Sequence, residues 1–374
     1  MKQEVGAVPL SGPYLDEREE ELVLDVLRSG RLSLGPTVDR FEEAFAATVG
    51  APHAAAVSSG TAGLHLLCVT AGIGPDDEVI TTPFSFAASA NCFIYEGAVP
   101  VFADIDPRTL NMLPAAVEAA VTTRTKAIVA VDIFGYPSEL DELRAIADRH
   151  GLALIADTCE ALGAEYRGAR LGSHGPSSVF AFYPNKQITT SEGGMVTTHS
   201  EEEWRLLRSL RNQGRGDAGG WLEHVRLGYN YRLDDVRAAI GIGQLEKLDE
   251  ILALREHVAQ RYGELLAGIP GVELPWPDDE EHRRSWFVYV VKLPDRNTRE
   301  RVIATFERER IGYNRYLPSI HLQPYMRDRY GFREGMFPAS EEASSRTLAL
   351  PFFTGLERDA QERVAEVLAA AIDP

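Results

Sequence analysis

One lysine of this chain stands where its amine could do chemistry. The sequence contains five lysines against 33 arginines, and only Lys186 lies in a loop between two predicted strands, beside small residues in FAFYPNKQITTSEGGMV. A primary amine can lose its proton and form a Schiff base with an aldehyde, whereas a guanidinium cannot. A solvated loop lysine is the simpler interpretation. Because arginine is the usual cation of this chain, we interpret Lys186 as a candidate nucleophile.

Two further features lie at predicted strand ends, where open α/β sheets bind ligands. Gly60 and Thr61 belong to the run Ser58-Ser59-Gly60-Thr61, directly before an apolar helix. The free N–H groups and the dipole of a helix N-terminus favour a phosphate. Asp157 closes the apolar run LALIAD. The simpler roles are a helix cap at Ser59 or Thr61 and a turn cap at Asp157.

Together, these features fit one cofactor. Pyridoxal phosphate needs a cradle for its phosphate, an acid at its pyridine nitrogen and a lysine for its aldehyde. The chain supplies these groups in the order Gly60 and Thr61, Asp157, and Lys186. Phe86, in TTPFSFAASAN, follows another predicted strand and could stack on the ring. The sequence therefore predicts a pyridoxal phosphate enzyme in which Lys186 and Asp157 are catalytic.

The elements that must position these residues alternate between strand and helix. Short apolar runs and amphipathic segments follow one another from about residue 53 to 200, which implies right-handed crossovers and a mostly parallel sheet with helices on both faces. The predicted strands are 79–81, 100–103, 127–131, 152–156, 179–182 and 195–197. The predicted helices are 15–29, 37–49, 62–71, 86–97, 114–121, 138–149 and 201–212.

The last third of the chain has a different pattern. One or two long helices are predicted over 234–268, followed by a strand at 286–292 and helices at 298–308 and 356–372. We expect an α/β protein of two domains. The large cofactor-binding domain, with an N-terminal helical arm, would cover residues 1–250, and a smaller C-terminal α/β domain would cover residues 251–374.

Charge and composition exclude several classes of function. The 374 residues include 56 acidic and 38 basic side chains, a net charge of −18, so DNA or RNA would be repelled. The three cysteines form no CxxC pair and the nine histidines no HxxxH pair, which argues against a disulfide framework and a metal site. No apolar run approaches the ~20 residues that span a bilayer. We expect a cytoplasmic enzyme with no metal, no nucleic-acid partner and no membrane partner.

The chain resembles the DegT/DnrJ-type sugar aminotransferases, which are fold-type I pyridoxal phosphate enzymes, over nearly its whole length. The likeness is carried by the ordered segments VPLSGPYLDEREEE, SGRLSLGPTVDRFEEAFA, VSSGTAGLHL, VITTPFSFAASAN, ADTCEALGA, FYPNKQITTSEGGMV and LGYNYRLDDVRAAIGIGQLEKL. The resemblance implies Lys186 as the Schiff-base lysine and Asp157 as the partner of the pyridine nitrogen. It likewise implies that Gly60 and Thr61 bind the phosphate and that Phe86 stacks on the ring.

The resemblance also implies roles that the motifs alone do not. Cys159 would lie near the other face of the ring, and Glu160 near the cofactor hydroxyl. Asn230, in GYNYR, would reach the phosphate in a neighbouring subunit, so a homodimer with shared active sites is implied. Arg315 and His321 would fall in the substrate-facing segment.

Four positions depart from the pattern of that family. Glu160 stands where Gln or His is common, and Asp132 stands where His is frequent. Ala181 replaces a frequent phosphate-binding Ser, and Ser191 replaces the usual Gly. Relatives that dehydrate sugars carry His at the position of Lys186, so the resemblance favours amination.

The resemblance implies amino transfer from an amino acid, by analogy glutamate, to a nucleotide-linked keto sugar. We expect a 4-keto-6-deoxyhexose, converted to an amino sugar for a polysaccharide or an antibiotic. The alternatives are a 3-keto sugar or a keto-cyclitol as substrate, or a non-catalytic regulatory relative with a damaged site or an added domain. An anionic nucleotide needs local cations in this acidic chain, and the candidates are Arg31, Arg211, Arg232 and Arg315.

Overall fold

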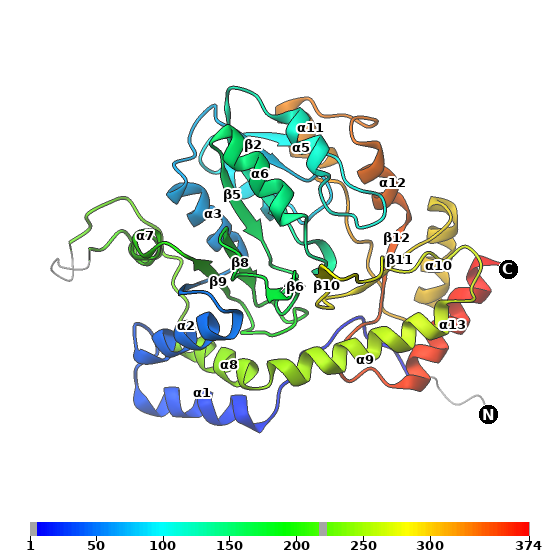
Figure 1. Ribbon diagram of the computed structural model, residues 1–374. Coiled ribbons are helices and arrows are strands. Elements are labelled where there is room, and N and C mark those ends of the chain that lie inside the picture. Colours follow the sequence, from blue (N-terminus) through cyan, green and yellow to red (C-terminus); the bar gives the residue numbers. More distant parts are fainter. Residues whose placement is uncertain (1–5, 217–222, 374) are drawn as a thin grey trace.

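The computed structural model describes residues 6–216 and 223–373 and is built around one large sheet (Figure 1). Its strands lie in the order β1-β9-β8-β5-β4-β2-β3. Neighbouring strands are parallel except at β9, which runs antiparallel to both β1 and β8. The sheet is therefore mostly parallel, as the sequence predicted. The strands are β1 His53–Val57, β2 Glu78–Thr81, β3 Val99–Phe102, β4 Thr125–Val131, β5 Ala153–Asp157, β8 Ser177–Ala181 and β9 Gly194–Thr198.

Helices cover both faces of this sheet because its strands carry apolar side chains on both sides. Along β4, Ala127 and Val129 pack with α3, α4 and α7, whereas Ile128 and Ala130 pack with α5 and α6 on the opposite face. None of the helices in the described ranges is long and apolar enough to cross a membrane. The helices are α1 Glu17–Ser29, α2 Pro36–Val49, α3 Gly60–Thr70, α4 Ala88–Ile94, α5 Pro114–Ala120, α6 Leu140–His150 and α7 Glu201–Arg211.

The C-terminal third forms a second hydrophobic cluster. Its helices α9, α10 and α13 pack around the antiparallel pair β11 and β12, and Val8 from the N-terminal segment joins them. A small sheet, in the order β10-β6-β7, lies between this part and the large sheet (Figure 1). The elements are β6 Glu165–Tyr166, β7 Ala169–Arg170, α8 Asp235–Glu246, α9 Leu248–Leu266, β10 His282–Arg283, β11 Tyr289–Lys292, α10 Arg296–Arg308, α11 Pro324–Tyr330, α12 Pro338–Arg346, β12 Thr347–Leu350 and α13 Arg358–Ile372. The domain division at residue 250 stays a prediction.

The differences from the predicted elements have local causes. The long helical stretch divides into α8 and α9 at Lys247, whose ammonium lies 2.8 Å from both Asp16 and Glu19 at the start of α1. Strand β1 was not predicted, because its sequence HAAAV is rich in alanine, a poor strand former, and its pairing with β9 is non-local. Helices α11 and α12 were also missed, since they are short and each buries few side chains.

Candidate active site

A cavity of about 540 Å³ opens at the carboxyl ends of β4, β5 and β8, where the sequence analysis placed its candidates. Four structural units contribute its predicted residues. Gly60 and Thr61 come from the first turn of α3, Phe86 from the loop after β2, Asp157 from the end of β5, and Lys186 from the loop after β8. The fold thus brings together residues that lie far apart in the sequence.

The first turn of α3 lies against the floor of the cavity because residue 60 is a glycine. A Cβ atom at Gly60 would come within 2.8 Å of Cys159 Sγ and 2.9 Å of Ala181 Cβ. Ser59 is the N-cap, as the simpler interpretation held, since its hydroxyl accepts a hydrogen bond of 3.1 Å from Ala62 N–H. The N–H groups of a helix's first turn have no partners inside the helix. In α3 the Ala62 N–H is taken by Ser59, and the N–H groups of Gly60 and Thr61 form a site at the cavity wall that suits an anion.

Asp157 is buried at the bottom of the cavity, with its carboxylate held on two sides. Oδ2 accepts a hydrogen bond of 2.7 Å from the Ser89 hydroxyl, which itself lies 2.7 Å from the Ser85 hydroxyl. Oδ1 accepts a weaker bond of 3.3 Å from Cys159 N–H. These contacts fix the orientation of the carboxylate, since both come from backbone or from a short side chain.

A second carboxylate, Asp132, lies behind Asp157. Its Oδ1 accepts hydrogen bonds of 2.8 and 2.9 Å from the N–H and hydroxyl of Ser138, and its Oδ2 accepts one of 2.9 Å from the Thr158 hydroxyl. Burial raises the pKa of Asp132 to about 6, against the effect of these donors. Asp132 ties the end of β5 to the turn after β4, and it does not line the cavity itself.

The amine of Lys186 lies inside the cavity between one acid and one aromatic ring. Nζ is 3.5 Å from Glu160 Oε1 and 3.9 Å from the centre of the Phe287 ring. The backbone carbonyl of Lys186 accepts a hydrogen bond of 2.8 Å from Arg255 of α9. Burial lowers the pKa of Arg255 to about 10. The lysine loop is therefore held from behind by a long helix, and the amine points into the cavity.

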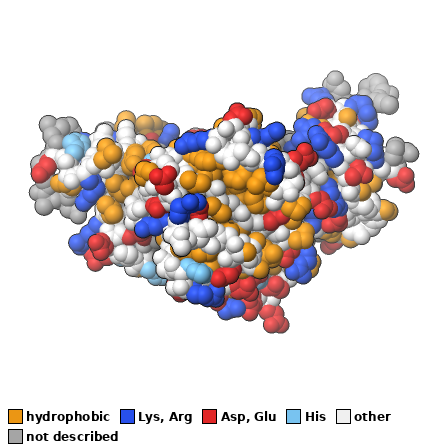
Figure 2. Space-filling view, turned by 90° about the horizontal axis from the view of Figure 1, so that it is seen from above, with side chains coloured by type: hydrophobic (Ala, Val, Ile, Leu, Met, Phe, Trp, Pro, Cys, Tyr) orange, Lys and Arg blue, Asp and Glu red, His pale blue; other side chains and the backbone are white. Residues whose placement is uncertain are grey.

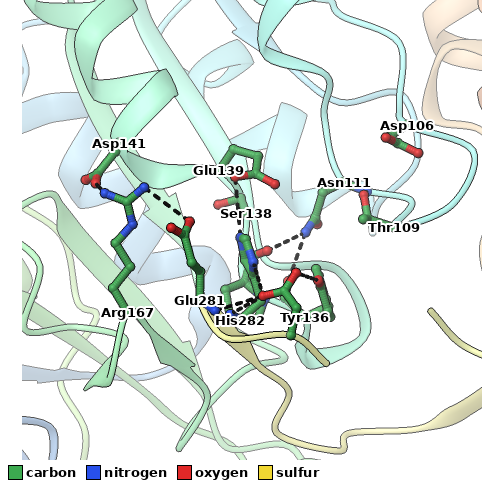
Figure 3. A network of polar contacts seen from close by, with 12 residues as sticks. Asp106, Thr109, Asn111, Tyr136, Ser138, Glu139, Asp141, Arg167, Glu281 and His282 are labelled. Atoms are coloured by element: carbon green, nitrogen blue, oxygen red, sulfur yellow. Dashed lines mark hydrogen bonds and ion pairs between the residues drawn. The ribbon is translucent and has the colours of Figure 1, made fainter. Parts of the chain in front are cut away.

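Glu160 is positioned by the turn that follows β4. Its Oε2 accepts a hydrogen bond of 2.9 Å from Phe134 N–H, and burial raises the pKa of Glu160. Phe134 has a φ of 52°, a left-handed conformation that a bulky residue rarely adopts. The amide of Asn111 supports this turn, donating to the carbonyls of Tyr136 and Pro137 at 3.0 and 2.9 Å (Figure 3). Asn111 also accepts from Ile133 N–H at 3.0 Å.

The sequence did not single out several residues that complete the cavity. Asn314, Tyr316 and Phe287 come from the C-terminal third, and Tyr183 and Asn185 flank the lysine. The Asn185 amide lies 3.3 Å from the Tyr316 hydroxyl, so the two walls touch. Only the pair flanking Lys186 carried a sequence signal, through its position in the lysine loop. The C-terminal residues reach the cavity through tertiary folding.

Six predicted residues do not line this cavity. Arg211 is buried and forms an ion pair with Glu42, and His321 is fully buried with Nε2 3.0 Å from Glu341 Oε1. Both therefore have structural partners that the sequence did not reveal. The other four are Arg31, Asn230, Arg232 and Arg315. Arg31 and Asn230 are exposed, and the backbone of Asn230 is bridged to that of Asn212. The Arg232 side chain donates to Asn212, and Arg315 forms an ion pair with Glu300.

The sequence profile of the DegT/DnrJ/EryC1/StrS aminotransferase family matches residues 13–369. The chain belongs to this family. SpsC of Bacillus subtilis, a spore coat polysaccharide biosynthesis protein, is 39% identical in an alignment that covers 96% of this chain and 96% of SpsC. This aminotransferase is also 32% identical to DesV of S. venezuelae, with a TM-score of 0.92 over 99% of this chain and 100% of DesV.

A third comparison agrees. A DegT DnrJ EryC1 StrS aminotransferase from Brucella abortus is 31% identical, with a TM-score of 0.88 over 96% of each chain. The protein is thus a pyridoxal-phosphate-dependent sugar aminotransferase with the fold-type I architecture, as the sequence resemblance predicted.

The residues of the cavity fit this cofactor. A primary amine, a fixed buried carboxylate and a helix N-terminus line the same cavity, and these match an aldehyde, a pyridine nitrogen and a phosphate. The glycine at position 60 allows the helix to approach Cys159 closely enough to close that wall. Position 181 contributes only a methyl group to the cavity lining, so this position offers no hydroxyl to a phosphate.

Proposed function

We propose that this aminotransferase moves an amino group from glutamate to a nucleotide-linked keto sugar, a 4-keto-6-deoxyhexose. The observation that carries the proposal is that Lys186, Asp157, Gly60 and Thr61 line a single cavity. The cavity holds about 540 Å³, room for a cofactor beside part of a sugar. The amino sugar would serve polysaccharide or antibiotic biosynthesis, and the name of the relative SpsC supports the polysaccharide.

In this proposal, each residue has one task in holding pyridoxal phosphate. Lys186 binds the aldehyde, and Asp157 pairs with the ring nitrogen. The first turn of α3, at Gly60 and Thr61, binds the phosphate. Phe86 has an exposed fraction of 65%, so its ring is available to stack on a planar ligand. Cys159 would face the other side of the ring and Glu160 its hydroxyl.

When bound, pyridoxal phosphate supplies a ring that accepts the electron pair left behind when a carbon loses its proton. The chain's residues do the rest. Lys186 Nζ would take the proton from the donor carbon and deliver it to the former aldehyde carbon of the cofactor, on the other side of the shared nitrogen, so that one amine serves as base and acid. Asp157, fixed by Ser89, places a negative charge beside the ring nitrogen. In the second half of the reaction, the same residues carry out these steps in the reverse order.

A nucleotide substrate requires cations near the cavity entrance, because the chain carries a net charge of −18. Arg232 is the best supported of the candidates. It donates to Asn212 at 2.9 Å and makes no ion pair with any residue that the structure describes. Burial lowers the pKa of Arg232, and repulsion from neighbouring Arg215 and Arg211 lowers it further. An incoming diphosphate would relieve this repulsion. Arg31 and Arg315 remain further candidates.

We also propose that two chains form a homodimer with shared active sites. Asn230 is exposed, and the segment before it carries Val225 and Leu227 with exposed fractions of 50% and 85%. Figure 2 shows hydrophobic side chains gathered across the middle of one face of the molecule. Apolar surface of this kind is usually covered by a partner. A second copy that covers the exposed side chains of Val225 and Leu227 would receive Asn230 at its cofactor phosphate.

Two further expectations complete the proposal. We place the enzyme in the cytoplasm, which is consistent with its free cysteines, Cys68, Cys92 and Cys159. We keep the division into a cofactor-binding domain over residues 1–250 and a C-terminal domain over residues 251–374. The regulatory alternative is disfavoured because the amine and the carboxylate are both present and oriented.

The test compares keto sugars side by side. The purified protein with pyridoxal phosphate and glutamate is incubated with a nucleotide-linked 4-keto-6-deoxyhexose, a nucleotide-linked 3-keto hexose and a keto-cyclitol, and amino products are measured by mass spectrometry. We expect stoichiometric amination of the 4-keto sugar. Preference for the 3-keto sugar or the cyclitol would correct the substrate. Amination of none of them, in protein that binds the cofactor, would contradict the proposed substrate class.

A further inference from the structure

Lys186 faces a protonation problem that the fold must solve. An ordinary lysine amine carries a proton at neutral pH, whereas only the neutral amine can attack an aldehyde. A base within reach of Nζ therefore speeds the attack. Among the described residues, Glu160 is the one carboxylate that forms an ion pair with Lys186, at 3.5 Å. Asp157 and Glu192 line the same cavity without such a contact.

The position of Glu160 is fixed independently of the lysine. Phe134 N–H binds Oε2 at 2.9 Å, so that Oε1 is the oxygen turned toward Nζ. The turn that presents this N–H is held by Asn111 through both its carbonyl and its amide. One carboxylate oxygen is thus occupied by the backbone, and the other is left for the amine.

The surroundings of the pair favour transfer of a proton over a permanent ion pair. Both side chains are almost fully enclosed, with exposed fractions of 13% for Lys186 and 11% for Glu160, and burial penalises the charged forms. It also raises the pKa of Glu160, which brings the carboxylate closer to the range of a working base. The groups that face the pair from the other packed elements are Asp157, Cys159, Tyr183, Arg255 and Tyr316.

We propose that Glu160 is a catalytic residue that takes a proton from Lys186 when the lysine captures its cofactor. The inference rests on the proposed role of Lys186 as the covalent anchor. An N–H bond of the ammonium breaks and an O–H bond forms on Oε1, which leaves a lone pair on Nζ for the aldehyde carbon. The second and third ammonium protons leave with the aldehyde oxygen as water, or one of them stays on the new linkage and Glu160 gives its proton to the departing water. When all three leave, Lys186 and Glu160 end neutral, with one carbon–nitrogen double bond formed and one water released.

Cofactor capture by the apoprotein tests this step without any turnover. The rate constant at saturating pyridoxal phosphate is followed by visible absorbance, and the linked residue is identified by mass spectrometry after borohydride reduction. We expect Glu160→Ala to slow capture at neutral pH by about 100-fold, the usual contribution of a positioned base. Added acetate, small enough to enter the space left by the side chain, should restore a large part of the rate in proportion to its concentration.

Two further variants complete the test. Glu43→Ala removes an exposed carboxylate of α2 that does not line the cavity, and we expect capture within about twofold of the wild-type rate. Glu160→Gln keeps an acceptor for Phe134 N–H but removes the basic carboxylate. It therefore tests the role of Glu160 as a base even if the alanine variant is misfolded. Capture as fast as wild type in either Glu160 variant, or slow capture of Glu160→Ala that acetate leaves unchanged, would overturn the proposal.

Failure of the proposed function would look different. If the wild-type apoprotein itself forms no reducible link at Lys186, then the anchor is misassigned, whatever Glu160 does. If the wild type is linked at Lys186 and the Glu160 variants capture the cofactor as fast as the wild type, Lys186 is the anchor and another group accepts its proton. The same measurements therefore separate the two hypotheses.

Discussion

The Ser89 hydroxyl donates a hydrogen bond of 2.7 Å to Oδ2 of Asp157, linking the second residue of α4 to the end of β5. Both groups are buried, with exposed fractions of 1% and 6%. A hydrogen bond to a charged group contributes about 1.5–3 kcal/mol. The orientation of the acid therefore depends on a serine from another layer of the fold.

Ser89→Ala is expected to lower kcat/KM by about 10-fold or more, because the carboxylate loses a charge-assisted hydrogen bond of about 1.5–3 kcal/mol. Steady-state kinetics with glutamate check this. Ser85→Ala is the matched control, since the Ser85 hydroxyl contacts Ser89 and not Asp157. Equal effects of the two substitutions would show that Ser89 acts through packing alone.

Lys186→Ala should abolish both turnover and the visible absorbance of the covalently bound cofactor, because no other described lysine lines the cavity. Lys186→Arg is expected to behave in the same way, although it keeps the positive charge near Glu160, since a guanidinium does not act as the nucleophile. Circular dichroism should report an intact fold for both. Retained turnover in either variant would remove Lys186 from the mechanism.

Gly60→Ala should weaken pyridoxal phosphate binding at least 10-fold and destabilise the protein by about 1–3 kcal/mol, the usual cost of overpacking. The added methyl group would lie 2.8 Å from Cys159 Sγ and would push the first turn of α3 away from the cavity. Gly74→Ala is the control, because no atom lies within 4 Å of the position that its methyl group would take. Cofactor titration and thermal unfolding measure both effects, and unchanged affinity for Gly60→Ala would contradict the phosphate site.

His282 predicts a pH dependence of stability. Burial alone would lower its pKa, but the ion pair with Glu139 at 3.4 Å and the hydrogen bond with Asp279 at 3.0 Å raise the pKa to about 8 (Figure 3). Because the pKa lies above the ordinary 6.5, the stabilisation is complete below pH 6.5 and is lost as the pH rises through 8. Because the carboxylates of Glu139 and Asp279 are partly exposed and therefore screened by solvent, the loss should be about 1 kcal/mol.

Urea unfolding of the wild type and of His282→Gln between pH 6 and 9 measures this loss. The variant should be less stable at pH 6 and should lack the additional decline above pH 7. His257→Gln, at an exposed histidine, should keep the wild-type profile. A wild-type stability that is flat across this range would show that the ion pairs of His282 do not stabilise the fold.

The sequence alone was sufficient to predict the site residues that lie within a recognisable local pattern. Lys186, Asp157 and Gly60 were found because each lies next to an element end whose pattern could be recognised, and the cavity unites them. Ser89 and Tyr316 could not be found in this way, since their importance comes from contacts 68 and 131 residues away along the chain. Arg211 looked like a substrate ligand because the sequence did not reveal its buried partner Glu42.

The guanidinium of Arg255 has a consequence for how this enzyme could diverge. It donates to the Lys186 carbonyl at 2.8 Å and to the Phe287 carbonyl at 3.2 Å, so one side chain of α9 fastens both backbones that border the amine. A small shift of α9 along its axis would change the position of the Lys186 amine without any substitution among the residues that line the cavity. Evolution can therefore tune the reactivity of this lysine through a buried arginine that does not line the cavity.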